Sequence, residues 1–411
     1  MSKKGKIIFV LATLFIIIAI AVGVIFGLRN ISTTPNIQNS SFPLASSSQD
    51  AVDSNSIENI TTSPQVHGLT DDTESLPADL KRLTLLTKNP VMAYWIATSS
   101  IVREVIASSS PLQSVVFYMN AEGDIIRIHA DGTESVVSHL GESPLHIIQS
   151  VSGSRVVVEF TSGSFAFFDV SRGAFEFLPQ GTVSAVFSPD GNTLAYLIVQ
   201  SSGKQELFIR DMTSLQKTTT KLFSLSLNDV KLAWPVDTRI YLLPLQSGSV
   251  VGEIWYFDIR TKTMNLFISK TGIGALFSTL SPSALIFYNE NTSSVRAYVQ
   301  DITKESSVSL TASTLLSKCA FSLDAVEILC AIPQMQSKTS GIQLPDDYNA
   351  MSIFTNDYLQ RFSAAHNYKA QDILTTTQAP FDAKDVRSRG RQMFFIDRLT
   401  DGLYMFDMRG L

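Results

Sequence analysis

From residue 83 onward, short apolar runs alternate with brief polar segments rich in Gly, Asp, Asn and Ser. This pattern predicts many short β-strands joined by tight turns, because helices need longer runs with a period near 3.6 residues. Several of the runs, such as 194–198, are apolar at both odd and even positions. A strand of that kind is buried on both faces, so its sheet must pack against a neighbour on each side.

One phrase returns at a regular interval: an apolar strand, an aspartate, an aliphatic residue and then polar residues. Its aspartates are Asp169, Asp211, Asp258, Asp301 and Asp407, which are 42, 47, 43 and 106 residues apart. The last gap is two periods plus an insertion. A period of this length with several strands per unit is typical of propeller blades. An aspartate can accept a hydrogen bond from the backbone N–H two residues on, so we interpret these residues as turn formers and not as metal ligands.

A second phrase, 186–196, combines a strand, a Pro-Asp-Gly turn and a returning strand. Counting both phrases predicts seven blades, the last of which has room for only three strands. We expect residues 83–87 to supply its fourth, outer strand and so close the ring. The predicted blades are 90–140, 145–180, 182–223, 229–270, 273–311, 315–377 and 380–411.

The stretch Phe187-Ser188-Pro189-Asp190-Gly191, followed by 207–211, resembles the WD-like repeat of TolB-type propellers. The order of repeats, with 344–348 and 400–404 in place, also resembles bacterial propeller proteins that carry a single membrane anchor. The resemblance covers roughly residues 81–411. It implies an all-β, seven-bladed β-propeller with four-stranded antiparallel blades, and it implies no activity.

Near the N-terminus, residues 7–28 form a run without a charge, in which 16 of 22 residues are Ile, Leu, Val or Phe. A helix of that length is about 33 Å long and can cross the hydrocarbon core of a bilayer. Three lysines precede the run, and such charges stay in the cytoplasm. We predict an uncleaved transmembrane signal anchor, with residues 1–6 cytoplasmic. A signal peptide cleaved near 19–21 is the alternative.

Residues 29–80 are rich in Ser, Thr, Asn and Gln and contain scattered prolines, with no periodic apolar positions. Such a composition buries too little apolar surface to fold. We therefore predict a flexible linker between the transmembrane helix and a propeller domain over 81–411. This order would hold the propeller outside the cytoplasm, at the cell membrane.

Composition and cysteine content narrow the picture further. The net charge is −5, so no basic field favours nucleic acid as a partner. The two cysteines do not form a Cys-x-x-Cys motif. A turn around 323–326 instead places Cys319 opposite Cys330 on antiparallel strands, at a separation that a disulfide tolerates. Export permits that bond; two packed free thiols are the alternative.

No catalytic motif stands out, because the five histidines lack metal-site spacing and neither a nucleophile elbow nor a phosphate-binding glycine loop occurs. We therefore expect no cofactor and no metal. The longest insertion, about 333–356, contains Asp346, Asp347 and Tyr348. Long loops on a rigid scaffold often carry function, so we expect this loop to overhang the central channel and bind a partner. A structural cover for the blade edge is the alternative.

Three arginines, Arg387, Arg389 and Arg391, crowd the first turn of the last blade. They could hold an anionic glycan or a lipid headgroup. A solvated turn in which the arginines face Asp382 and Asp385 is the simpler interpretation.

These expectations describe a membrane-anchored, extracytoplasmic propeller that serves as a binding or scaffold module for a protein, peptide or glycan of the cell envelope. The bilayer would be a second partner, through the N-terminal helix. The alternative is an envelope hydrolase or lyase acting on polysaccharide, with carboxylates converging at the channel. Clustered acids in a pocket would favour the enzyme, and an apolar patch rimmed by polar groups would favour the binder.

Overall fold

The computed structural model describes residues 82–98, 112, 114–213, 218–227, 229–291, 294–304, 306–311, 313–322, 326–334, 342–375 and 380–409. Within these ranges, none of the helices has the length and apolar character needed to cross a bilayer. The predicted transmembrane helix at 7–28 and the linker at 29–80 lie outside the described residues, and both stay predictions.

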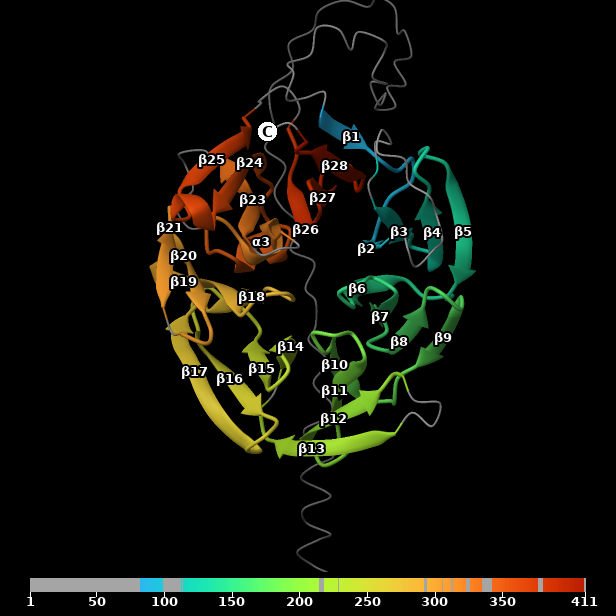
Figure 1. The fold of residues 1–411 in the computed structure, drawn as a ribbon, viewed down its shortest axis with the longest axis vertical. Coiled ribbons are helices and arrows are strands. Elements are labelled where there is room, and N and C mark those ends of the chain that lie inside the picture. The colour runs from blue at the N-terminus through green and yellow to red at the C-terminus, as the bar shows by residue number, and fades with distance from the viewer. Residues whose placement is uncertain are drawn as a thin grey trace, which may run out of the picture. The chain divides into compact units, whose positions relative to one another are not determined.

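In the described part of the chain, the strands form seven four-stranded antiparallel sheets. Figure 1 shows these sheets arranged radially around a central axis, with the innermost strand of each nearest the axis. This arrangement confirms the predicted all-β, seven-bladed propeller. The observed blades agree with the predicted ranges to within a few residues.

The bounds of the strands follow the chain from blade to blade. Blades 1 and 2 contain β2 (Ala93–Ala97), β3 (Val115–Met119), β4 (Asp124–Ile128) and β5 (Glu134–His139), then β6 (Pro144–Gln149), β7 (Arg155–Phe160), β8 (Phe165–Asp169) and β9 (Ala174–Phe177). Blades 3 and 4 contain β10 (Thr182–Phe187), β11 (Thr193–Val199), β12 (Gln205–Asp211) and β13 (Thr219–Leu225), then β14 (Val230–Val236), β15 (Arg239–Pro244), β16 (Val251–Asp258) and β17 (Thr263–Thr271).

The remaining blades carry the short helical turns. Blade 5 contains β18 (Gly274–Phe277), β19 (Ser283–Asn291), β20 (Ser294–Asp301) and β21 (Ser307–Leu310). Blade 6 contains η2 (Leu316–Lys318), β22 (Cys319–Phe321), β23 (Glu327–Gln334), α3 (Asp346–Asn349), β24 (Asn356–Ser363), η3 (Ala364–His366) and β25 (Ala370–Leu374). Blade 7 contains β26 (Ala383–Arg389), β27 (Gln392–Asp397), β28 (Leu403–Asp407) and β1 (Leu83–Leu85).

The ring closes through β1, which pairs antiparallel with β28 and places Leu83 opposite Phe406. The outer strand of the last blade therefore comes from the start of the domain, as predicted. This pairing joins the two ends of the propeller by main-chain hydrogen bonds and removes an open sheet edge.

Apolar clusters of the described residues fill the seams between neighbouring blades, and β3 shows why its residues are apolar on both faces. Val115 and Phe117 point into the cluster shared with blade 2, which also contains Phe160. Val116 points the other way, into the cluster shared with Phe394 of blade 7. Because successive strand residues alternate between faces, a blade packed on both sides requires apolar residues at every position.

The recurring aspartates close tight turns, as the sequence predicted. In each of the five copies, one carboxylate oxygen accepts a hydrogen bond from the backbone N–H two residues later, at 2.8–3.0 Å. At Asp301, hydrogen bonds from Thr303 lower the pKa of the carboxyl group to about 2. These side chains are occupied by their own turns and serve the fold.

Cys319 and Cys330 face each other in the register of β22 and β23, with 4.1 Å between their Cα atoms. The predicted facing pair is confirmed, and the structure joins the two sulfurs in a disulfide. Because these strands are the first two of blade 6, the link fixes the innermost strand of that blade to its neighbour.

Candidate functional site

A central cavity opens between the innermost strands, at the rim that carries the turns between the first and second strands of each blade. One lobe, of about 280 Å³, is lined by β6, β18, β22 and β26 together with their following turns. A second lobe, of about 350 Å³, extends toward β10 and β14 and shares with the first the residues around His146, Gln149 and Leu276–Thr279. Each lobe has roughly the size of a small-molecule pocket.

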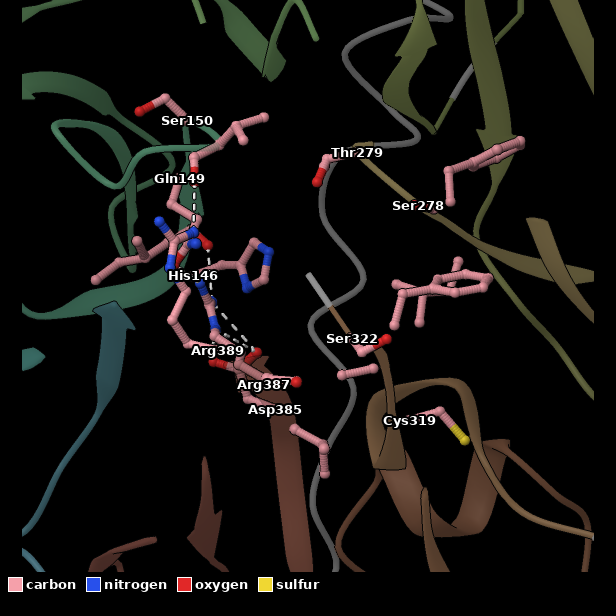
Figure 2. Close-up of a pocket in the computed structure, with 18 residues that line it drawn as sticks. His146, Gln149, Ser150, Ser278, Thr279, Cys319, Ser322, Asp385, Arg387 and Arg389 are labelled. Atoms are coloured by element: carbon pink, nitrogen blue, oxygen red, sulfur yellow. Dashed lines mark hydrogen bonds and ion pairs between the residues drawn. The ribbon is translucent and has the colours of Figure 1, made fainter. Parts of the chain in front are cut away.

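The two walls of the first lobe differ in chemistry, as Figure 2 shows. The wall from blades 5 and 6 presents Phe277 and Phe321 together with the hydroxyl group of Thr279. The hydroxyl groups of Ser278 and Ser322 are buried and bond the backbone of their own turns. The wall from blades 7 and 2 presents an acid, two arginines, a histidine and an amide. Among the described residues that line the two lobes, Asp385 is the only carboxylate.

A bulge in β26 sets the position of the charged wall. The pairing of β26 with β27 slips between Lys384 and Arg387, and Asp385 adopts a positive φ of 50°. Such a bulge bends the strand and redirects the following side chains, and an aspartate tolerates this left-handed backbone better than most residues. The bulge brings Asp385 and Arg387 together at 3.1 Å.

Arg387 is satisfied by protein groups. It donates to Gln149 Oε1 at 2.9 Å and to the carbonyl of Ile147 at 3.0 Å, and it lies over the ring of Tyr94. Burial lowers the pKa of Arg387, but the nearby Asp385 carboxylate more than offsets this and raises it. Arg387 therefore links blade 7 to blade 2 by hydrogen bonds and to blade 1 through the ring of Tyr94. This role is structural.

Arg389 has a different environment. It is 9% exposed and donates one hydrogen bond, from Nη1 to the carbonyl oxygen of Val151 at 2.8 Å. Burial lowers the pKa of its guanidinium, and among the described residues no carboxylate pairs with it. The remainder of the guanidinium lines the cavity.

His146 extends into the cavity from β6, as Figure 2 shows, and its side chain is exposed there. The surrounding walls restrict hydration and lower the pKa of the ring below its usual value, although the Asp385 carboxylate opposes this effect. An imidazole of ordinary pKa is already mostly neutral at pH 7, so among the lining side chains the unpaired positive charge is that of Arg389.

A second concentration of charge lies at the opposite rim, in the seam between blades 6 and 7. Lys318 donates to Asp357 at 2.5 Å and to Asp382 at 2.7 Å, and all three side chains are fully buried. Asp382 also pairs with Arg398 at 3.2 Å. We call Lys318, Asp357, Asp382 and Arg398 the seam cluster; its formal charges balance.

The two carboxyl groups of the seam cluster have opposite pKa shifts. Burial raises the pKa of Asp357 despite the attraction of Lys318. Burial acts in the same direction on Asp382, but Lys318 and further hydrogen bonds from Tyr348 and Thr355 outweigh it and lower the pKa. Asp382 therefore stays ionised to a lower pH than Asp357 does.

The predicted partner-binding loop packs onto the seam cluster. Tyr348, on α3, is 3% exposed and donates its hydroxyl to Asp382 at 2.8 Å. Its ring lies 3.9 Å from the guanidinium carbon of Arg398. Tyr348 is thus part of the interior, which differs from the predicted role in partner contact, because the aromatic ring covers two buried cations.

The other two loop residues form hydrogen bonds within the propeller. Asp346 accepts from Ser247 Oγ at 3.2 Å and from the N–H of Gly248 at 3.1 Å, which ties the loop to blade 4. Asp347 accepts from the N–H of Gln343 at 2.7 Å. Partner binding by this loop stays a prediction, while its described contacts are those of a cover over blades 4–7.

The expected solvated turn around the three arginines is only partly correct. Arg387 does face Asp385. Asp382, however, is fully buried and belongs to the seam cluster, because it precedes β26 at the opposite rim from Arg389. Arg391 is exposed and does not line the cavity lobes.

Comparison with known proteins identifies the fold and no more. No known protein family matches the sequence, and no curated protein matches it. Among solved structures, the chain is similar to TolB from Acinetobacter baumannii, at 14% identity and a TM-score of 0.39, over 71% of this chain and 63% of that chain. The chain thus spans less than two thirds of TolB.

Two further solved structures are similar to the chain. Oligogalacturonate lyase from Vibrio parahaemolyticus is 7% identical, with a TM-score of 0.54 over 80% of this chain and 94% of that chain. The C-terminal WD40 domain of Sif2 is 11% identical, with a TM-score of 0.47 over 79% of this chain and 98% of that chain. Propellers of the TolB and WD40 types are thus among the structures that the chain is similar to, as expected, while the propeller fold itself rests on the seven four-stranded sheets. A propeller fold by itself does not determine a function.

Proposed function

We propose that the propeller is a recognition module that takes a segment of another envelope protein into its central cavity. The observation that supports this most is the pairing of unlike walls, one largely apolar with the hydroxyl group of Thr279 and the other cationic. Apolar surface with a few placed polar groups is the usual make-up of a binding site. The cavity admits a few side chains and not a folded domain, so the partner would insert a short segment.

The same cavity offers little to acid–base catalysis. An enzyme of the alternative type would need carboxylates that converge on a reacting bond, whereas the one carboxylate among the described lining residues is held by Arg387. This supports binding over hydrolysis or lysis. Release of unsaturated sugar from oligogalacturonate by the purified full-length chain would overturn that choice.

In this proposal the predicted membrane helix at 7–28 holds the propeller at the outer face of the cell membrane, and residues 29–80 serve as its tether. A tether of about 50 residues would separate its ends by about 40 Å. The module would then reach partners near the membrane. Protease added to intact cells should cleave the propeller from the membrane fraction; protection of the whole chain would contradict this placement.

Site-specific photo-crosslinking can test recognition. A photoreactive phenylalanine derivative at Thr279, which is exposed to the cavity, should form a defined adduct in the native cell. The control position is Val136, which is 66% exposed on the outer strand of blade 1. Filling the cavity with His146→Trp, at an exposed position that lines both lobes, should abolish the Thr279 adduct. Adducts of equal yield at both positions, or adducts that survive the filled cavity, would refute the proposed site.

A further inference from the structure

Arg389 is a buried cation whose charge the protein leaves unbalanced. Its guanidinium has five N–H donors, and the described residues accept one hydrogen bond from it, at Val151 O. A buried charge without an opposite partner is costly. The other guanidinium donors of Arg389 open into the cavity, where they are available to a bound anion.

The neighbouring acid cannot supply that counter-charge. Both oxygens of Asp385 lie within hydrogen-bond distance of Arg387. An imidazole such as that of His146 is mostly neutral at pH 7 and supplies no negative charge. Since Asp385 and Arg387 cancel, the first lobe carries one net positive charge, and it lies at Arg389.

The wall opposite Arg389 indicates which chemical group of a ligand would lie beside its anionic group. Phe277 and Phe321 line the same lobe as Arg389. Thr279 lies across the opening from Arg389 in Figure 2. A ligand that satisfies both walls carries an anionic group at one side and an apolar group at the other. The cavity of about 280 Å³ limits each to a group of side-chain size.

We propose that Arg389 binds a single carboxylate of the inserted peptide segment, and that an apolar side chain next to this carboxylate packs against Phe277 and Phe321. The proposal rests on the proposed recognition function and assigns the chemistry of the ligand. An arginine forms two parallel hydrogen bonds with a carboxylate, which gives the site both orientation and selectivity.

A peptide fits this cavity better than an acidic polysaccharide. A uronate chain carries one carboxylate and several hydroxyl groups on every ring, and it would need several cations and many acceptors. The described lining residues provide one unbalanced cation and no free carboxylate. A single carboxylate beside an apolar group is the property of a peptide that ends in, or contains, an acidic residue.

The test uses 3-phenylpropionate as the probe and its amide, 3-phenylpropanamide, as the uncharged match. Ligand-observed NMR titration of the full-length protein should show binding of the carboxylate and weak or no binding of the amide. Arg389→Gln should weaken the binding of the carboxylate probe at least about tenfold, since a charge-assisted hydrogen bond is lost. Arg389→Lys should retain part of the affinity, because it keeps the charge but not the fork.

Two controls keep the result interpretable. Arg172→Gln changes an arginine whose side chain is 73% exposed on blade 2 and should leave binding unchanged. Thermal unfolding of each variant reports on folding. If Arg389→Gln does not fold, a soaked crystal of the native protein decides: density for the probe carboxylate on Arg389 supports the proposal, and density elsewhere overturns it.

Further probes separate the possible sources of the carboxylate. Acetyl-Gly-Phe with a free C-terminus and acetyl-Asp-Phe amide distinguish a terminal carboxylate from a side-chain carboxylate; binding of neither overturns the proposal. Tighter binding of trigalacturonate than of both peptides would also overturn it. If the Thr279 adduct forms equally well in Arg389→Gln and is lost only in the filled-cavity variant, recognition in the cavity stands and the carboxylate subsite fails.

Discussion

Two buried cations of this propeller, Lys318 and Arg389, have opposite surroundings. Lys318 is fully buried and meets two carboxylates, the hydroxyl of Thr355 and the carbonyl of Ala383, all within 3.0 Å. Arg389 is almost as buried but meets one carbonyl group. A cation with a complete set of partners holds the fold together, whereas a cation without a counter-charge is available to a ligand.

The difference also follows their positions along the blades. Lys318 precedes β22 at one rim, in the seam between blades 6 and 7, where both blades supply acidic groups. Arg389 ends β26 at the other rim and faces the cavity. The same innermost layer of strands thus has a closed, charge-balanced end and an open, charged end.

The largest effect is expected from Lys318→Met, which leaves the two seam carboxylates buried without a cation. Removal of one partner from a buried ion pair costs about 3–5 kcal/mol. Urea unfolding followed by tryptophan fluorescence should show this loss in the free energy of unfolding. Lys304→Met removes a lysine that is 77% exposed and should cost less than about 1 kcal/mol. Similar losses in the two variants would break the comparison.

The two acids of the seam cluster should differ from each other. Asp382 accepts from Lys318, Arg398 and Tyr348, among others, and its pKa is lowered. The pKa of Asp357 is raised, so a neutral amide replaces it more easily. We expect Asp382→Asn to cost about 3 kcal/mol and Asp357→Asn clearly less. The reverse order in urea unfolding would be inconsistent with these opposite shifts.

The disulfide should make the next largest contribution to the free energy of unfolding. It joins Cys319 to Cys330, which is 11 residues away in the sequence. Closing a loop of about this size stabilises by about 2–3 kcal/mol. Cys319→Ser and Cys330→Ser should lower the free energy of unfolding equally. Intact-mass measurement without reductant should find the native chain lighter by two hydrogens than the same chain after reduction. The mass of the dithiol form would mean that the cysteines are packed free thiols, the alternative drawn from the sequence.

Asp301 shows what to expect of a charged group whose partners are all close in sequence. Its contribution to the free energy of unfolding should be smaller and should depend on pH. The folded pKa of Asp301 is about 2, below the usual value near 3.9, so the folded state favours its charged form. This stabilisation is present above about pH 4 and is lost as the pH falls toward 2. Asp301→Asn should cost at most about 1 kcal/mol at pH 7 because solvent screens the group. The difference from native protein should shrink in urea unfolding at pH 2–3; a difference that grows there would contradict the sign.

The smallest effect on stability is expected at Arg389. Because Arg389→Gln removes a buried charge without an acidic partner, the free energy of unfolding should change by about 0.5 kcal/mol or less, or rise. The same urea titration measures it beside Lys318→Met. A loss as large as that of Lys318→Met would show that Arg389 is a structural cation after all.

Local turn chemistry explains why so much of the fold could be predicted from the sequence. Each turn aspartate finds its hydrogen-bond partner two residues away, so the pattern is visible in a short window. The closing strand at 83–85 was predictable for a related reason: the last blade has too few residues for four strands, and an unpaired edge is unfavourable. The facing pair Cys319 and Cys330 follows from the short stretch of sequence between two antiparallel strands.

The sequence thus determined the repeat, the number of blades and the way the ring closes, because those depend on contacts within one blade or on chain length. Only the tertiary structure decided which charged residues meet. Lys318 and Asp382 are 64 residues apart, and Arg387 reaches Gln149 across 238 residues. Contacts over such separations produce no pattern within a short stretch of sequence, because closure of the ring brings blades that are distant in sequence together. The same geometry separates Arg389 from the acids of the described residues and so leaves the cavity with an unbalanced charge.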